Sequence, residues 1–244
     1  MVHGSHRSSR TFMRNIPALG RHFRVYAPDL PGYGDSDPVR DREPLPDMVE
    51  FLCEFALAVD ARSAHWIGES RGGGYCIQFA ARKPGNVASL VLVSPVGLPP
   101  RELPKPAELS TASAWEWFLE RSVEDPSCFD DADREALLRN LGKASPYEKR
   151  RLAATSPQYN RMGLVDDIVC VTAPVMLAWG RQDPVFPVEC MERFRELLPN
   201  VQRTLVLDRA RHLCFMERSD EFNEAVISFF QQPQPTTETP DVIA

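Results

Sequence analysis

The chain has 244 residues, of which 43% are hydrophobic and 25% charged, and its formal net charge is −6. These values are typical of one folded domain with a sizeable core, and no apolar run approaches the roughly 18 residues that a membrane span needs. Because Lys and Arg are scattered along the chain, nucleic acid and anionic membranes are excluded as main partners, and a small-molecule substrate is expected instead.

The amino-terminal residues 1–14 carry charges and histidines but no apolar stretch. They do not form a secretory signal, so we expect a cytoplasmic protein. The six cysteines are widely spaced, with no C-x-x-C pair and no clustered histidines beside them. They are therefore expected to be free, mostly structural thiols, and no metal and no cofactor is predicted.

Short β-rich runs alternate with helix-like stretches along most of the chain. The predicted strands are residues 23–27, 65–67, 90–93, 175–179 and 204–207. The predicted helices are residues 47–59, with Asp47 as N-cap, 71–82, 188–198 and 217–230. This alternation is typical of an α/β fold with a mostly parallel sheet and flanking crossover helices.

The alternation stops in the middle of the chain, where prolines crowd residues 99–106. Helical patterns follow at residues 113–122, 131–141 and 147–154. We predict that residues 98–171 are a helical lid inserted into the domain. In one interpretation Trp115, Trp117 and Phe118 line the substrate pocket, and in the other they only dock a short helix onto the core.

The insertion divides the predicted domain into a first core part, residues 1–97, and a second core part, residues 172–232. Residues 233–244 form a tail that is rich in Pro and Thr and has no periodicity. We expect this tail to be mobile.

The strongest local motif is Gly68-Glu69-Ser70-Arg71-Gly72. It follows a predicted strand and precedes a predicted helix, which is the setting of a nucleophile elbow. A nucleophile on such a tight turn takes a strained backbone conformation that lifts its hydroxyl clear of the sheet, and flanking glycines let neighbouring segments approach. A G-x-S-x-G pentapeptide also arises by chance in glycine-rich turns, but the strand-to-helix setting favours Ser70 as nucleophile.

A serine hydroxyl needs a base to take its proton and a third group to orient that base. In this type of fold the chain order is nucleophile, acid, histidine. Four of the five histidines precede Ser70, so His212 is the predicted base. It follows the predicted strand 204–207, at the sheet end where sites in open α/β sheets gather.

The acid is expected in the loop after strand 175–179, which offers Asp183. Asp208 lies too close to the strand that leads into the histidine loop. The other place where such folds carry the acid, Ser94 to Gly97, has no carboxylate. The alternative for Asp183 is a turn-forming Asp before a proline.

An oxyanion hole needs two backbone N–H donors, one from the residue after the nucleophile and one from an early loop. The first donor is Arg71. The loop His3-Gly4-Ser5-His6 supplies the second, for which Ser5 is our choice.

Five segments together resemble the α/β-hydrolase superfamily: His3-Gly4, residues 27–36, Gly68 to Gly73, Trp179 to Asp183, and Arg211-His212 followed by residues 220–223. The resemblance covers almost the whole chain except the lid and the tail. Within the superfamily, the triad order and residues 220–223 look most like hydrolases that cleave carbon–carbon bonds in ring-opened aromatic metabolites, and their esterase relatives. Those enzymes usually carry a longer Gly-rich oxyanion loop, and a Trp where this chain has Leu213.

The Arg71 side chain is unusual at its position. It could pair with a substrate carboxylate at the pocket floor. The alternative is a salt bridge to the lid or to Glu69.

The amino end departs from the fold that the resemblance implies. There, the loop with His3-Gly4 follows a strand lying between residues 23–27 and 65–67, and only Met1-Val2 remain to supply it. We therefore expect amino-terminal strands to be missing from the sheet, leaving unpaired backbone groups and an apolar slot between its neighbours. The protein either begins further upstream or has an incomplete sheet with impaired activity.

These observations predict a serine-dependent hydrolase that cleaves a small apolar ester, or a carbon–carbon bond of a ketone, by acyl transfer. Three alternatives stay open at this point. His212 could activate water directly, the chain could be a hydrolase-like receptor or scaffold that only binds a small molecule, or it could act as a cofactor-free haloperoxidase. No oligomeric state is predicted.

Overall fold

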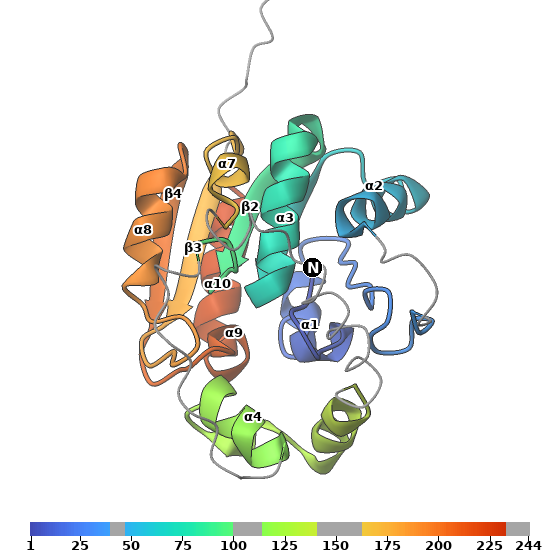
Figure 1. Cartoon of the computed structure of the whole chain (residues 1–244), viewed down its shortest axis with the longest axis vertical. Coiled ribbons are helices and arrows are strands. Elements are labelled where there is room, and N and C mark those ends of the chain that lie inside the picture. The colour runs from blue at the N-terminus through green and yellow to red at the C-terminus, as the bar shows by residue number, and fades with distance from the viewer. Residues whose placement is uncertain (40–46, 100–113, 141–162, 233–244) are drawn as a thin grey trace, which may run out of the picture.

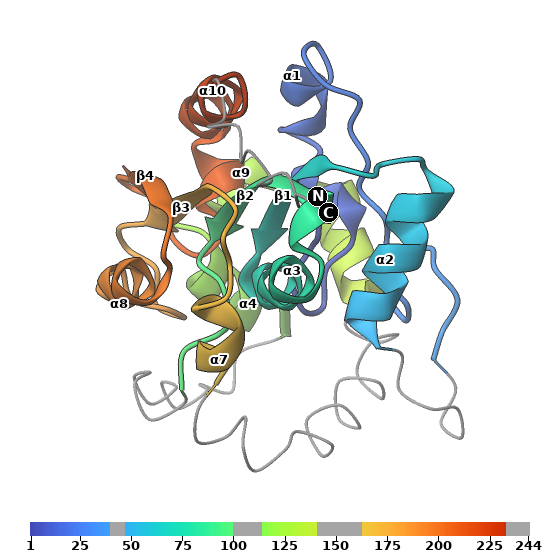
Figure 2. The same cartoon turned by 90° about the horizontal axis from the view of Figure 1, so that it is seen from above.

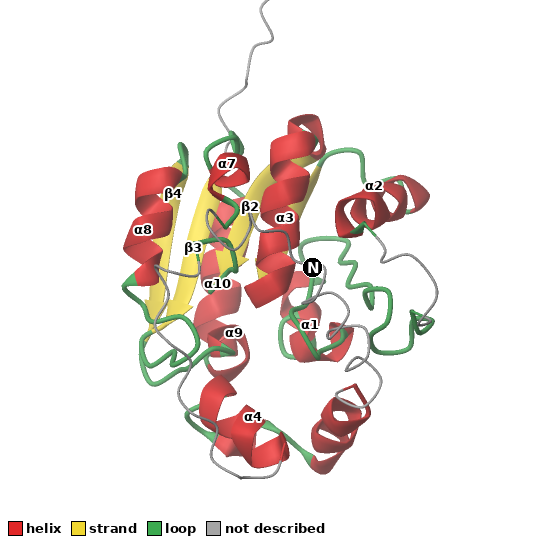
Figure 3. Cartoon of the chain, viewed as in Figure 1, coloured by secondary structure: helices red, strands yellow, loops and turns green. Residues whose placement is uncertain are grey.

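A computed structural model describes residues 1–39, 47–99, 114–140 and 163–232. At its centre is one four-stranded parallel sheet in the order β1-β2-β3-β4 (Figure 3). The strands are β1 (Ala64–Glu69), β2 (Val87–Val93), β3 (Val175–Gly180) and β4 (Val201–Leu207). The predicted parallel α/β architecture is confirmed.

Helices cover both faces of this sheet (Figure 2). One face carries α2 (Met48–Ala58), α3 (Ser70–Arg82), α7 (Val165–Ile168) and α8 (Cys190–Leu197), and the other carries α1 (Ile16–Leu19), α9 (Cys214–Glu217) and α10 (Ser219–Phe230). Side chains of β2 alternate between the two cores, because Leu90 and Leu92 pack with the first set and Val91 and Val93 with the second.

The helix boundaries agree closely with the sequence pattern. Asp47 caps α2 as predicted, since its carboxylate accepts from the backbone N–H groups of Val49, at 2.8 Å, and Glu50, at 3.3 Å. The predicted helix 217–230 is α10, which begins two residues later than predicted, because Glu217 ends the preceding helix α9. Helices α9 and α10 are separated at Arg218, whose φ of −118° and ψ of 50° are not helical.

The described residues also include three short 3₁₀ turns, η1 (Ser9–Phe12), η2 (Pro84–Asn86) and η4 (Pro126–Cys128). The predicted lid contributes α4 (Ala114–Ser122) and a helix over residues 131–140, and both lie beyond the carboxyl ends of the strands (Figure 1). The predicted helix at 147–154, most of the proline-rich segment and the tail 233–244 lie outside the described residues.

The predicted strand at residues 23–27 is wrong, because this segment is extended but belongs to no strand. On the side facing β1 its backbone is bonded to Met1, and the Phe23 ring contacts the ring of His65 on β1 at 5.9 Å between centroids. The Met1 amine donates to the Tyr26 carbonyl at 2.7 Å, and Val2 forms one isolated parallel bridge with Gly68. Two residues are too few to build a ladder that joins residues 23–27 to the sheet.

No helix in the described ranges is long and apolar enough to cross a membrane. All six cysteines fall within these ranges and are free thiols. Burial raises the pKa of Cys76 and of Cys128 to about 12, which keeps both thiols protonated and unreactive near neutral pH.

Candidate active site

The motif around Ser70 forms a strand–turn–helix elbow. Strand β1 ends at Glu69 and α3 begins at Ser70, whose φ of +50° lies in the left-handed region that non-glycine residues seldom occupy. A Cβ on Gly68 would lie 2.7 Å from the Gly72 carbonyl oxygen, and a Cβ on Gly72 would lie 2.6 Å from that of His3. Both glycines of the motif are therefore required by close backbone packing.

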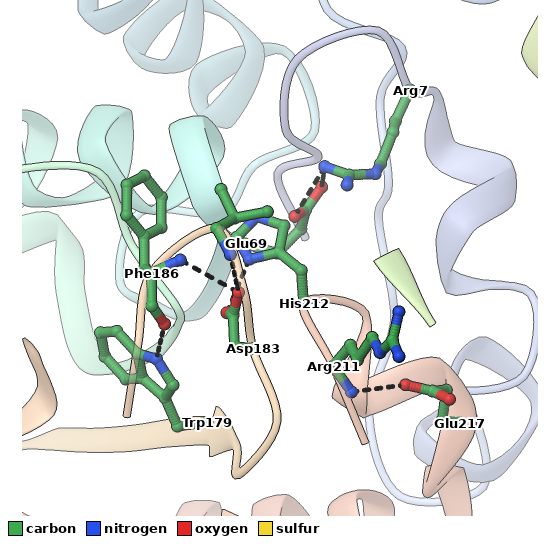
Figure 4. A network of polar contacts seen from close by, with 9 residues as sticks. Arg7, Glu69, Trp179, Asp183, Phe186, Arg211, His212 and Glu217 are labelled. Carbon is green, nitrogen blue, oxygen red and sulfur yellow. Dashed lines mark hydrogen bonds and ion pairs between the residues drawn. The ribbon is translucent and has the colours of Figure 1, made fainter. Parts of the chain in front are cut away.

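Asp183 and His212 meet across the loops that follow β3 and β4 (Figure 4). His212 Nδ1 lies 2.8 Å from Asp183 Oδ2, and both side chains are buried. The other carboxylate oxygen of Asp183 accepts from the backbone N–H groups of Val185, at 2.8 Å, and Phe186, at 3.0 Å. The carboxylate is thereby fixed, and it holds the imidazole with Nδ1 as the donor, leaving Nε2 free to accept a proton.

Ser70, Asp183 and His212 all follow carboxyl ends of parallel strands, namely those of β1, β3 and β4. They therefore share one edge of the sheet. Within the part of the chain that the structure describes, no hydrogen bond joins the Ser70 hydroxyl to His212. Such catalytic hydrogen bonds are often long in unliganded enzymes and tighten when substrate binds.

The loop that carries Ser5 is tied to both neighbours of Ser70. The Gly4 N–H donates to Glu69 Oε1 at 2.5 Å, on the amino side of the nucleophile. On the carboxyl side, Arg71 Nε donates to the Ser5 hydroxyl at 2.9 Å. Among the described residues, the Arg71 guanidinium is bonded to the early loop, and the predicted alternative of a salt bridge to Glu69 is not formed, because Glu69 pairs with Arg7.

The partner of Glu69 is Arg7 (Figure 4). Arg7 Nη1 lies 3.1 Å and 3.2 Å from the two carboxylate oxygens of Glu69, whose side chain is only 1% exposed. A buried carboxylate without a partner would cost several kcal/mol, and Arg7 together with the Gly4 N–H satisfies this one. The same guanidinium lies 5.7 Å from the centre of the Phe118 ring on α4.

His3 fixes the other end of this loop as a neutral imidazole. Its Nδ1 lies 2.9 Å from the Gly4 carbonyl, so Nδ1 carries the proton, and its Nε2 accepts from the Leu30 N–H at 2.9 Å. Burial lowers the pKa of His3. His6 has a φ of +61°, a conformation that favours glycine.

Asp29 joins the start of η1 to the turn at residues 32–36. Its carboxylate accepts from the N–H groups of Ser9, at 2.6 Å, and Asp35, at 2.7 Å. Burial alone would raise the pKa of Asp29, but these hydrogen bonds outweigh it and the pKa is lowered. A Cβ on Gly34 would collide with this carboxylate, and the φ of Gly34 is +50°, so the turn requires glycine at this position.

The carboxyl end of α4 is attached directly to the histidine loop. The Leu213 N–H donates to the Ser122 carbonyl at 2.8 Å, and Arg211 bonds the Glu120 carbonyl and the Glu124 carboxylate. The helix therefore forms part of the roof above the carboxyl edge of the sheet.

Glu217, the last residue of α9, accepts further hydrogen bonds that join the segment after α4 to the histidine loop. Its Oε1 accepts from the N–H groups of Glu124, at 2.6 Å, and Asp125, at 3.0 Å, and its Oε2 accepts from that of Arg211 at 2.7 Å. Burial raises the pKa of this carboxyl. A single side chain thus links the segment after α4 to the loop that carries His212.

Of the three aromatic residues predicted for the pocket, Phe118 is buried and contacts the ring of Phe129 at 5.6 Å between centroids. A small cavity of about 40 Å³ lies beside it, lined also by Arg7, Leu213 and Met216. Trp115 and Trp117 are on α4, but their side chains lie outside the described residues. In the described ranges no group of three His, Cys, Asp or Glu side chains is arranged to hold a metal ion.

Sequence reasoning missed the roles of Arg7, Asp29 and Glu217. Arg7 and Glu69 are 62 positions apart, and Glu217 lies 93 positions from Glu124. A periodic sequence pattern cannot predict contacts between residues so far apart in the chain. One signal was available for Glu69, because a charged residue beside a buried elbow must find a partner.

The alpha/beta hydrolase family profile matches residues 1–225, and the chain belongs to this family. The 2-hydroxy-6-oxononadienedioate/2-hydroxy-6-oxononatrienedioate hydrolase of Cupriavidus pinatubonensis is 29% identical, over 94% of this chain and 85% of its own length. The carboxylesterase YbfK of Bacillus subtilis is 27% identical, over 94% of this chain and 78% of its own.

Among solved structures, the meta-cleavage product hydrolase of Pseudomonas fluorescens has a TM-score of 0.74 at 26% identity, covering 93% of this chain and 88% of that one. These relatives are carbon–carbon bond hydrolases and esterases, as the sequence resemblance predicted. They support assignment of this chain as a hydrolase.

Proposed function

We propose that this protein is a serine hydrolase in which Ser70 is the nucleophile, His212 the base and Asp183 the acid. The observation that carries the proposal is the buried Asp183–His212 hydrogen bond at the sheet edge to which the strained Ser70 turn also belongs. This arrangement supplies a base held in one tautomer at the same sheet edge as the nucleophile elbow.

In the proposed reaction His212 Nε2 takes the proton of the Ser70 hydroxyl while the serine oxygen bonds to the substrate carbonyl carbon. The carbonyl electrons move onto its oxygen, which the backbone N–H groups of Ser5 and Arg71 stabilise. Collapse of this intermediate breaks the bond to the leaving group, which takes the proton from His212. A water molecule then releases the acyl group from Ser70 by the same steps.

The substrate class we propose is a small apolar ester or a ketone cleaved at a carbon–carbon bond. Support comes from the apolar roof around Phe118 and from relatives whose names describe an esterase and a carbon–carbon bond hydrolase. Residues 98–171 are the proposed lid, and Trp115, Trp117 and Phe118 are its proposed substrate-binding residues. The six free thiols agree with a cytoplasmic location.

The test is labelling of the purified protein with a fluorophosphonate probe, together with hydrolysis of short p-nitrophenyl esters and of a dienone. We expect one label per chain, on Ser70, and loss of both labelling and turnover in Ser70→Ala. A folded protein that neither labels nor hydrolyses any of these substrates would favour a receptor or scaffold. Turnover that survives Ser70→Ala would point to direct activation of water by His212.

A further inference from the structure

Ser94 ends its strand beside the proposed nucleophile, at the carboxyl edge of the sheet. It directly follows β2, whose last residue, Val93, is in register with Glu69 of β1. The residue after Glu69 is Ser70, so the two serines leave neighbouring parallel strands at the same level. The Ser94 N–H also donates to the Ala178 carbonyl at 3.0 Å, which attaches this position to β3 on its other side.

The segment after Ser94 supports the nucleophile turn. The Val96 N–H donates to the Ser70 carbonyl at 2.9 Å. A Cβ on Gly73 would lie 2.7 Å from the Cβ of Pro95, so this segment and the first turn of α3 are closely packed. Position 94 is therefore connected both to the nucleophile turn and to β3.

Two features of Ser94 are unfavourable for stability. Its φ of +39° lies in the left-handed region that residues other than glycine seldom adopt. The residue is fully buried, and within the described residues its hydroxyl has no hydrogen-bond partner, although buried hydroxyls normally have one. A glycine would avoid both costs. Strained and unsatisfied groups of this kind are concentrated at functional sites.

The Asp183 carboxylate, in the loop after β3, has room for one more donor. Its Oδ1 accepts two backbone N–H groups, but within the described residues its Oδ2 accepts only from His212, and a carboxylate oxygen can accept two hydrogen bonds. The thiols of Cys190 and Cys214 also interact with this carboxylate. Burial raises the pKa of both thiols, so neither is charged near neutral pH.

We propose that Ser94 is a positioning residue of the triad, and that its hydroxyl donates to the free position on Asp183 Oδ2 when His212 takes the Ser70 proton. This inference rests on the proposed function. A second donor on Oδ2 keeps the negative charge on the carboxylate and the proton on the imidazole. Because Ser94 is fully buried, it acts through Asp183 and does not touch the substrate.

The test compares Ser94 with a second buried serine, Ser89 of β2, whose hydroxyl does have a partner, His65 Nδ1 at 2.8 Å. Ser94→Ala should lower kcat on p-nitrophenyl esters about tenfold, through loss of a hydrogen bond to a charged group, and leave KM unchanged. It should not lower the unfolding midpoint, because the hydroxyl is unpaired in the free protein. Ser89→Ala should lower the midpoint and leave kcat unchanged. An undiminished kcat in Ser94→Ala would overturn the proposal.

A double variant tests whether Ser94 acts through Asp183. In an Asp183→Asn background, Ser94→Ala should not slow fluorophosphonate labelling further, because the effects of residues that act as a unit do not add. A further loss of the same size as in the unmodified background would refute the proposal.

The kcat–pH profile gives an independent measurement. Ser94→Ala should move its acid limb to higher pH, because a carboxylate with one donor fewer stabilises protonated His212 more strongly. An acid limb that stays in place would contradict the proposed role. Ser94→Gly also relieves the left-handed strain, so it provides a second variant without the hydroxyl and should show the same loss of kcat.

These measurements separate the role of Ser94 from the proposed function. Full turnover in Ser70→Ala would show that the triad is wrong, and this inference with it. If Ser70→Ala is inactive while Ser94→Ala and Ser94→Gly match the unmodified protein, only the role of Ser94 is wrong.

Discussion

The Glu69 carboxylate, which immediately precedes the nucleophile, accepts the backbone N–H of Gly4 at 2.5 Å and so holds the loop that carries Ser5. Arg7 neutralises the same carboxylate, and Arg71 binds the Ser5 hydroxyl from the other side. The two residues that flank Ser70 therefore both position the proposed oxyanion donors, and neither needs to touch the substrate to affect the rate.

Replacing Glu69 should lower kcat more than it changes KM. Glu69→Ala removes the acceptor of the Gly4 N–H and leaves Arg7 buried without a counter-charge, so we expect kcat to fall by about 10²-fold, as for loss of an oxyanion donor. Breaking the buried pair should also destabilise the fold by about 3–5 kcal/mol. Steady-state kinetics on p-nitrophenyl esters and denaturant unfolding measure the two effects.

Two further variants separate positioning from folding in this case. Glu69→Gln keeps an acceptor for the Gly4 N–H and should recover part of kcat, while Glu69→Ala combined with Arg7→Met should recover stability without recovering kcat. If the double variant regained full kcat, the carboxylate would have no positioning role.

Asp183→Asn should abolish most activity while leaving the fold intact. The asparagine oxygen can still accept from the Val185 and Phe186 N–H groups, so the loop is retained. Its amide would then favour the wrong imidazole tautomer, which lowers kcat by about 10⁴-fold in comparable triads. Fluorophosphonate labelling rates give the measurement, and an unchanged rate would remove Asp183 from the mechanism.

The free energy of unfolding should decrease as the pH is lowered, because His3 is buried as a neutral imidazole. The folded pKa is lowered by burial, so the unfolded chain takes up the proton first, near pH 6.5. The stability contributed by neutral His3 is therefore complete above this value and is lost as the pH falls through the folded pKa. Denaturant unfolding between pH 7.5 and 5.5 should show a steeper loss for the unmodified protein than for His3→Asn. An equal loss of stability with falling pH in the two proteins would contradict this prediction.

Glu217→Ala should loosen the roof and the histidine loop together. The variant loses three hydrogen bonds from the N–H groups of Glu124, Asp125 and Arg211, and bonds to a charged acceptor contribute about 1.5–3 kcal/mol each at most. We expect a higher KM, a lower kcat and faster proteolysis near α4. Glu224→Ala, on the exposed side of α10, is the matched control and should change none of these.

Gly72→Ala should destabilise the protein because its Cβ would collide with the Val2 carbonyl and lie 2.6 Å from that of His3. Overpacking of this kind costs about 1–3 kcal/mol, or more where backbone must move. Gly85→Ala is the control, since nothing lies within 4 Å of its Cβ position. Unfolding midpoints that agree for the two variants would show that the elbow does not need a glycine at position 72.

The parts of the fold that could be predicted from sequence are those set by local pattern and chain order. Alternating β-rich and helical stretches, with Gly68 to Gly72 at one junction, predict the elbow because strand, turn and helix are adjacent in the chain. Position after a strand is also enough to predict that Asp183 and His212 lie at one sheet edge, since parallel strands align their carboxyl ends.

The remaining features depend on contacts that no local pattern encodes. Residues 23–27 have strand propensity, but a strand also requires a partner, and Met1 and Val2 provide only one rung. The Arg7–Glu69 pair and the attachment of α4 to Arg211 join residues 62 and more positions apart. These contacts are set by packing in three dimensions, because a buried charged group is stable only when a group of opposite charge or a hydrogen-bond partner lies close to it.

The hydrogen bond from Leu213 to Ser122 has a consequence for how this scaffold changes its substrate range. The residue beside the proposed base supports the end of the roof helix, so a ligand that lifts the end of α4 also pulls on His212. Enlarging the cavity at the carboxyl end of α4 would therefore lower the reactivity of His212 as well as change how the substrate fits. Adaptation to bulkier substrates should therefore proceed through residues 131–140, where Asp133 is bonded to Arg10 and Asn140 to the Gly34 N–H.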